Sequence, residues 1–137
     1  MKPIPNERDH YNAAVKNLTF YNLNTTNFPK HPEWALIIMF YEIIHLIERV
    51  FAIATLRKEY KHSDSHYKRY NTMQYLWRYI PREVLVKYTT LKNLSLDARY
   101  EYDTISFEKL KQTKNNEYTD LKDFFQQLFR KMKKSRI

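Results

Sequence analysis

Residues 34–56, WALIIMFYEIIHLIERVFAIATL, are the longest apolar run of the chain. The run is apolar around most of a helical circumference, which is typical of a helix at the centre of a bundle. Three ionisable residues inside it, Glu42, His45 and Arg49, follow one another at intervals of three and four, so a helix places them in one line. Charged groups in such a helix must be paired, face a groove or serve a site. We expect a structural or dimer-interface polar stripe here, with a functional site as the alternative.

The composition of the 137-residue chain narrows its chemistry, because glycine and cysteine are both absent. Without glycine, the sequence excludes glycine-rich phosphate loops, dinucleotide fingerprints and G-x-S-x-G nucleophile elbows. Without cysteine, it excludes disulfides, thiolate metal sites and thiol nucleophiles. His62 and His66 have a spacing that suits zinc on a helix, but no neighbouring acidic pattern completes the set. We therefore expect no metal and no cofactor.

Helical periodicity recurs along the rest of the chain, and no strand pattern competes with it. The predicted helices span residues 6–22, 32–61, 65–79, 81–96 and 106 onward, the last with a break near 115–116. The third of these would place five apolar or aromatic residues on overlapping faces: Tyr67, Tyr70, Met73, Leu76 and Trp77. Residues 97–105 are expected to form a loop, and the basic C-terminal end, residues 130–137, to fray. The sequence predicts an all-α, antiparallel up-and-down bundle of four long helices plus short extra helices, in one domain over residues 1–137.

The charge of the chain points to an acidic partner. Its net charge is +9, and it carries 12 tyrosines and two tryptophans, a combination that single-stranded RNA contacts use. The alternative is that the lysines are solvated and the aromatic residues form the core. Four ionisable groups in the central run would each cost about 2.5 kcal/mol or more at mid-bilayer. Because no signal peptide opens the chain either, we expect a soluble, cytoplasmic protein with no membrane partner.

A basic cluster, RKEYKHSDSHYKR at residues 57–69, follows the central run. A histidine can move a proton at the 2′-hydroxyl or leaving oxygen of RNA, and an arginine can stabilise the phosphorane charge, so the pattern suits metal-free RNA cleavage. The candidate catalytic residues are Arg57, His62 and His66. The candidate RNA or phosphate contacts are Lys58, Lys61, Arg69 and Arg99. The alternative is a helix end that carries solvated charges.

Twelve residues, in this order and spacing, resemble small HEPN-domain proteins of bacteria and archaea: Trp34, Tyr41, His45, His62, His66, Arg69, Tyr88, Leu91, Ser95, Ala98, Arg99 and Tyr100. The resemblance covers roughly residues 8–132. It implies an antiparallel helical bundle that forms a homodimer, and an RNA-associated function as a metal-independent endoribonuclease of toxin or defence type. Single-stranded RNA and a cognate antitoxin or other partner protein are the partners it implies. The alternative is a non-catalytic basic interaction module that binds nucleic acid or an acidic partner protein.

Overall fold

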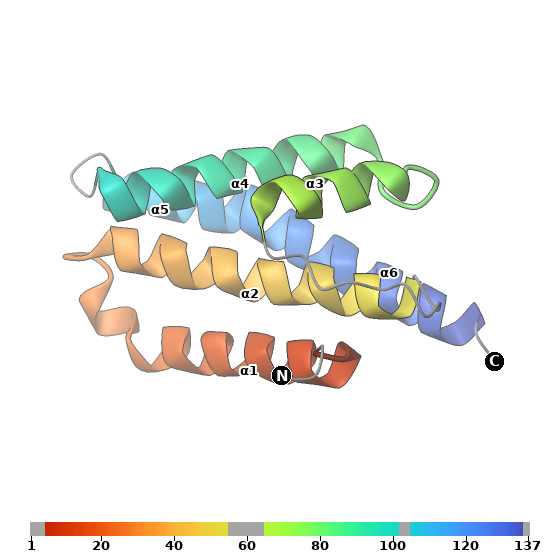
Figure 1. Cartoon of the computed structure of the whole chain (residues 1–137). Coiled ribbons are helices and arrows are strands. Elements are labelled where there is room, and N and C mark those ends of the chain that lie inside the picture. Colours follow the sequence, from red (N-terminus) through yellow and green to blue (C-terminus); the bar gives the residue numbers. More distant parts are fainter. Residues whose placement is uncertain (1–4, 55–64, 102–104, 136–137) are drawn as a thin grey trace.

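The protein is a helical bundle in the computed structural model, which describes residues 5–54, 65–101 and 105–135. All of its secondary structure within these ranges is helical (Figure 1). The long helices are α1 (Glu7–Leu23), α2 (Pro32–Ala54), α4 (Arg82–Tyr100) and α6 (Thr119–Ser135). The shorter ones are η1 (Thr25–Asn27), α3 (His66–Tyr75), α5 (Phe107–Thr113) and η3 (Lys114–Tyr118). The predicted all-α bundle with four long helices is confirmed.

Helix α2 is the centre of the bundle. In Figure 1 it runs between α1 on one side and α4, α5 and α6 on the other, and it contacts all of them. Most of its apolar residues are buried, and Leu36, Ile43 and Val50 have no exposed surface. The long helices alternate in direction along the chain (Figure 1), so that one contiguous hydrophobic core forms around α2. Within the described ranges, none of the helices has both the length and the apolar character that crossing a bilayer demands.

The predicted helix starts at Asn6, Ser65 and Ser106 are confirmed by their caps. The Asn6 side chain accepts from the Asp9 N–H, and the Asp9 side chain accepts in turn from the Asn6 N–H, both at 2.9 Å. The Ser65 and Ser106 hydroxyls each accept an N–H of the first turn of α3 and α5, at 3.1 and 3.0 Å. Such caps typically contribute about 1 kcal/mol each. Polar residues at the turns thus position the ends of α1, α3 and α5.

Two predicted boundaries in the second half of the chain are wrong. Helix α4 continues to Tyr100 instead of fading near Leu96, because Ser95 and Ala98 are buried and extend its inner face by another turn. The expected break near residues 115–116 is a π-helical turn that joins α5 to α6 without interruption. A π-turn inserts one extra residue per turn, and this shift brings Tyr118 into the core.

Helix α3 is shorter than predicted. It ends at Tyr75 and not near Tyr79, and the chain continues through a turn in which Leu76 and Ile80 are buried. Trp77, which was expected on a helix face shared with Met73 and Leu76, is exposed to solvent in this turn, whereas those two residues are buried. The early end of α3 therefore separates Trp77 from these core residues.

Candidate nucleic-acid interface

The structure describes only one residue of the predicted catalytic cluster, His66. Arg57 and His62, and the predicted phosphate contacts Lys58 and Lys61, lie outside the described residues. Their roles stay predictions. His66, the remaining candidate catalytic residue, begins α3 directly after the Ser65 cap.

Arg69, a predicted phosphate contact, lies inside the bundle. Only 5% of its surface is exposed, and its Nε is 3.4 Å from the carboxylate of Glu48, which is fully buried. Its Nη1 donates to the Tyr88 hydroxyl at 3.4 Å. A buried carboxylate needs a close cation, because an uncompensated charge in the interior costs several kcal/mol. The Arg69 guanidinium thus neutralises Glu48 and links α2, α3 and α4.

His66 belongs to the same network. The Nη1 group of Arg69 lies 3.2 Å from the Nδ1 of His66, and the His66 ring lies 5.4 Å from that of Phe40. Burial, and then the charges of Arg69 and Lys92, hold the pKa of His66 below its usual value. Because an arginine can only donate, Nδ1 must accept and the proton of the neutral imidazole is on Nε2. His66 is therefore a neutral histidine whose basic nitrogen is already engaged.

Arg99, another predicted phosphate contact, lies near the C-terminal end of α4. Its guanidinium covers the Tyr41 ring at 4.7 Å and it is half-buried. It comes 11 residues after Tyr88, which contacts Arg69, so Tyr88 and Arg99 are roughly 16 Å apart along the axis of α4. The structure does not bring Arg69 and Arg99 together into one pocket.

Glu42, the first residue of the predicted polar stripe, is paired with helices across the core. The Tyr118 hydroxyl donates to its carboxylate, and the Lys122 Nζ lies 3.0 Å from it. Burial, and then the hydrogen bond to Glu42, raise the pKa of Tyr118 far above its usual value. Glu42 thus contacts the end of η3 and the start of α6.

His45 and Arg49, the other two residues of the stripe, contact α1 and α6. The Nδ1 of His45 is 3.4 Å from that of His10, which is buried. The Arg49 guanidinium lies 4.4 Å from the centre of the Tyr11 ring and 3.4 Å from that of Phe129. Each member of the stripe therefore has partners within this chain, which agrees with the structural interpretation.

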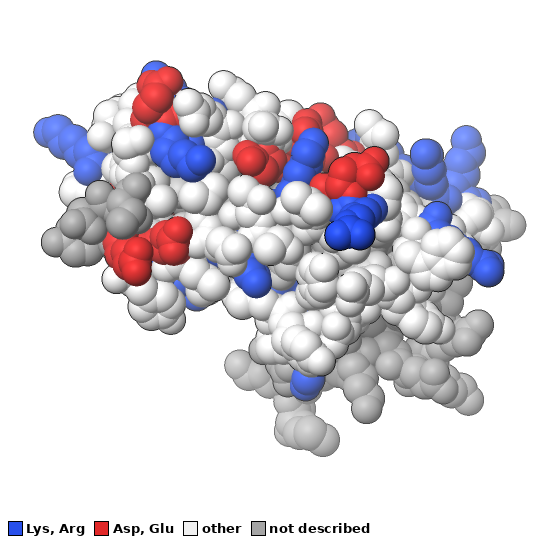
Figure 2. All heavy atoms as spheres, turned by 90° about the horizontal axis from the view of Figure 1, so that it is seen from above, with Lys and Arg blue, Asp and Glu red and all other residues white. Residues whose placement is uncertain are grey.

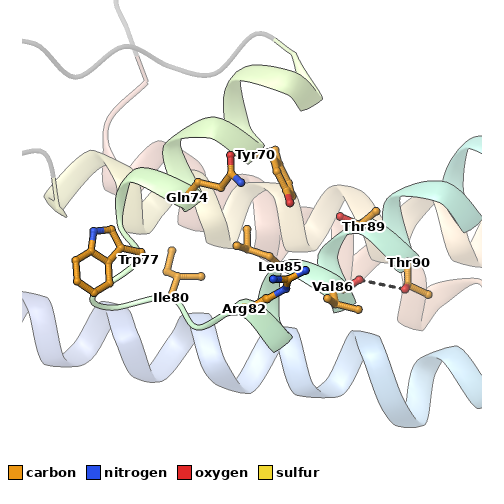
Figure 3. A pocket seen from close by; sticks show the side chains of 9 residues that line it. All are labelled: Tyr70, Gln74, Trp77, Ile80, Arg82, Leu85, Val86, Thr89 and Thr90. Atoms are coloured by element: carbon orange, nitrogen blue, oxygen red, sulfur yellow. Dashed lines mark hydrogen bonds between the residues drawn. The ribbon is translucent and has the colours of Figure 1, made fainter.

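A cavity of about 730 Å³ lies between α3 and α4. Tyr70, Gln74 and Trp77 line it from α3 and the turn that follows, at helical intervals of four and three. Arg82, Leu85 and Thr89 are among the residues that line it from α4. In Figure 3, Trp77 stands at one end and Tyr70 and Thr89 toward the other. We call this cavity the α3–α4 groove; it combines aromatic rings with an arginine and hydrogen-bonding side chains.

Aromatic side chains around the α3–α4 groove are exposed to an unusual degree. The exposed fractions are 76% for Tyr67, 78% for Tyr75, 68% for Trp77 and 55% for Tyr79. Trp77 also lies next to Arg78, whose guanidinium is 5.3 Å from the ring centre. This surface was not predicted, because Tyr67 and Trp77 were expected on overlapping faces of a longer helix. Five aromatic residues within 13 positions, with arginines at 78 and 82, are the signal in the sequence.

The charges on the face that Figure 2 shows are mixed. Lys and Arg side chains alternate there with acidic and uncharged ones. Further Lys and Arg side chains stand at the end of the molecule where the α3–α4 turn and the C-terminal part of α6 lie (Figures 1 and 2). In the sequence these segments contribute Arg78, Arg82, Arg130, Lys131, Lys133 and Lys134. The basic character is therefore strongest near the Trp77 end of the α3–α4 groove.

Comparison of the chain with protein-family models, with curated proteins and with solved structures finds no match among any of them. The geometry of the chain itself is therefore what bears on its function.

Proposed function

We propose that this protein binds single-stranded RNA through the α3–α4 groove. The observation that carries the proposal is the set of exposed aromatic rings on α3 and the turn after it, above all Trp77, which lines the groove, and Tyr75, which follows the lining residue Gln74. Unpaired bases stack on aromatic side chains with little dependence on sequence, and each stacked base contributes about 1–3 kcal/mol. Exposed rings of this size are otherwise unfavourable in water.

The other residues that line the groove suit the same ligand. Arg82 can contact a phosphate, and Gln74 and Thr89 can donate to or accept from base edges or a 2′-hydroxyl. The net charge of +9 attracts a polyanion at long range. Binding that combines stacking with phosphate contacts is what single-stranded nucleic-acid sites use.

We further propose that the protein is a HEPN-like, RNA-associated protein that acts as a homodimer, of toxin or defence type. The helical bundle agrees with the architecture that the resemblance implies. Support for cleavage is weaker than support for binding, because His66 already accepts a hydrogen bond from Arg69. An endoribonuclease activity would therefore depend on Arg57 and His62.

A second candidate function is binding of an acidic partner protein, such as a cognate antitoxin, at the same groove. Its lining favours this alternative in one respect, because Ile80, Leu85 and Val86 are apolar and would suit a protein side chain. RNA binding would in addition use the exposed rings beyond the groove itself, such as Tyr67 and Tyr75, on which bases can stack.

Titration of the protein with labelled single-stranded RNA in EDTA tests both RNA binding and RNA cleavage. We expect a saturable complex whose affinity falls with salt, with a slope of about −0.7 in log K against log salt for each phosphate contact. RNA recovered intact supports binding alone, whereas cleavage that His62→Ala abolishes would assign the endoribonuclease. Indifference to RNA at low salt, with an intact fold, would contradict the proposal.

A further inference from the structure

A second hollow lies at the turn between α1 and α2, at the opposite end of the bundle from the α3–α4 turn (Figure 1). It measures about 440 Å³, which is within the range of small-molecule pockets. Its apolar walls come from three elements: Phe20 from α1, Phe28 from the segment after η1, and Trp34 and Ile38 from α2. Because three successive segments within residues 20–38 converge here, the hollow is built by the fold of the α1–α2 hairpin.

The rings of this pocket differ in how well they are covered. Phe28 is buried and packs on Tyr21 at 4.6 Å, so it forms a fixed floor. Phe20 and Trp34, in contrast, are 53% and 61% exposed although they line the cavity. Two uncovered rings beside a fixed apolar floor favour a flat ligand, because aromatic surfaces gain most from stacking against another ring.

The polar side chains of the pocket are uncharged amides and an imidazole. The Nδ2 of Asn24 donates to the Phe20 carbonyl at 2.7 Å, which fixes this amide at the edge of the pocket. Asn27 and His31 also line it. Among the described residues that line the cavity there is no Asp, Glu, Lys or Arg. The pocket thus offers hydrogen-bond donors and acceptors on two amides and on the His31 imidazole, whose Nδ1 is 3.7 Å from a carboxylate oxygen of Glu33, and this favours a neutral polar ligand over an anion.

We propose that this pocket binds a neutral, planar heteroaromatic ring that carries both donors and acceptors on its edge, of the nucleobase kind. The ring stacks on Trp34 and Phe20, and its edge meets the amides of Asn24 and Asn27. Such a ring has two sources, a free nucleoside or an unpaired base of an RNA strand. The inference does not rest on the α3–α4 groove, since the two pockets lie at opposite ends of the bundle.

The two tryptophans of the chain allow this pocket to be observed alone. Trp34 and Trp77 are its only tryptophans, and each lines one of the two cavities. In a Trp77→Phe variant, all tryptophan fluorescence reports on the α1–α2 pocket. We expect adenosine or a short unpaired oligoribonucleotide to quench it in a saturable way, whereas benzyl alcohol, which has a ring without donors and acceptors on its edge, has a much weaker effect.

Two further substitutions in the Trp77→Phe background serve as a matched pair. Phe20→Ala removes one stacking surface and should weaken binding about tenfold or more. Leu23→Ala removes an apolar residue of α1 that is even more exposed, 78% against 53% for Phe20, and that does not line the pocket, so it should leave the affinity unchanged. Both side chains are exposed, so neither change should unfold the protein.

The outcomes separate the sources of the ring. Saturation by adenosine assigns a free nucleoside, and saturation by the oligoribonucleotide alone assigns a base of a strand. Quenching by neither probe, equal quenching by benzyl alcohol, or equal affinity in the Phe20→Ala and Leu23→Ala variants would overturn the proposal. Failure of RNA binding at the α3–α4 groove would instead appear in the Trp34→Phe variant, which retains Trp77.

Discussion

Helix α3 has an inner face that is buried and an outer face that is exposed to solvent, and the two carry unexpected kinds of side chain. The inner face carries Arg69, a cation that is buried and paired with Glu48. The outer face and the following turn carry Tyr75 and Trp77, large rings that are mostly in water. Basic residues in the sequence suggested where a polyanion binds, but on this helix the arginine holds the fold together. The uncovered aromatic rings are the better indicator of a binding surface.

The largest effect on stability is expected from substitution of Arg69 on the inner face of α3. Arg69→Ala leaves the Glu48 carboxylate buried without this cation and should lower the free energy of unfolding by about 3–5 kcal/mol. Lys68→Ala, at the exposed neighbouring position, should change it by no more than about 0.5 kcal/mol. Urea denaturation of the two variants gives the comparison, and equal stabilities would contradict the role assigned to Arg69.

A double variant sharpens that result. Replacing both partners by apolar residues of similar size, as in Glu48→Leu with Arg69→Met, removes the charge that Arg69→Ala leaves behind. We expect the double variant to be more stable than Arg69→Ala alone. A double variant that is less stable would mean that the Arg69 side chain acts mainly through contacts other than the Glu48 pair.

The second-largest effect is expected at Tyr118, which contacts the other buried carboxylate of α2. Tyr118→Phe removes the hydroxyl that donates to Glu42 and should cost about 1.5–3 kcal/mol, the range for hydrogen bonds to charged groups. Because burial and Glu42 raise the pKa of Tyr118, the unfolded chain releases this proton at a lower pH than the folded one. The stability should therefore fall above about pH 10, the usual tyrosine value, and Tyr118→Phe should weaken that fall. An unchanged alkaline profile would contradict this.

On the outer face, Tyr75→Ala should weaken RNA binding by about 1–3 kcal/mol, which is roughly 5- to 150-fold, without lowering stability. Tyr100→Ala is its matched control, since the two tyrosines are both 78% exposed. Tyr100 lies 10 residues beyond Thr90, the last residue that lines the groove, which is roughly 15 Å along α4. Binding of a short oligoribonucleotide, followed by fluorescence anisotropy, measures both. Equal losses would mean that exposure alone, and not the groove, sets the affinity.

The smallest effect concerns the pH dependence that His66 confers. Burial, and then Arg69 and Lys92, lower the pKa of His66 in the folded chain, so the unfolded chain binds this proton more readily. The stability it contributes is present above about pH 6.5 and is lost as the pH falls below that value. Urea denaturation near pH 7.5 and near pH 5 should show a smaller decrease for His66→Gln than for the wild type. His31→Asn removes an exposed histidine and serves as the control. If the stability of His66→Gln falls between these pH values as much as that of the wild type, the prediction is contradicted.

The parts of the fold that the sequence predicted depend on local signals. The apolar run around Ile43 marks the central helix, and Asn6, Ser65 and Ser106 mark helix starts through caps that act within three residues. The end of α3 has no such signal, because the residues after Tyr75 continue an apolar pattern and the chain has no glycine to mark a C-cap.

The candidate site was harder to predict because its contacts join distant positions. Glu42 and Tyr118 are 76 residues apart in the sequence, and no local pattern connects them. Similarly, nothing near Arg69 shows that it pairs with Glu48 rather than with a phosphate. Whether a charged or aromatic side chain faces the core or the solvent is decided by how the helices pack, and this is where the assignments of Arg69 and Trp77 differed from the structure.

The fluorescence of Trp77 tests the central claim most directly. In a Trp34→Phe variant, Trp77 is the sole tryptophan and lies in the α3–α4 groove. We predict that single-stranded RNA quenches its fluorescence with the same midpoint as the anisotropy change of the labelled RNA, because a base stacks on the indole ring. RNA that binds with unchanged Trp77 fluorescence would place the interface elsewhere on the bundle and contradict this account.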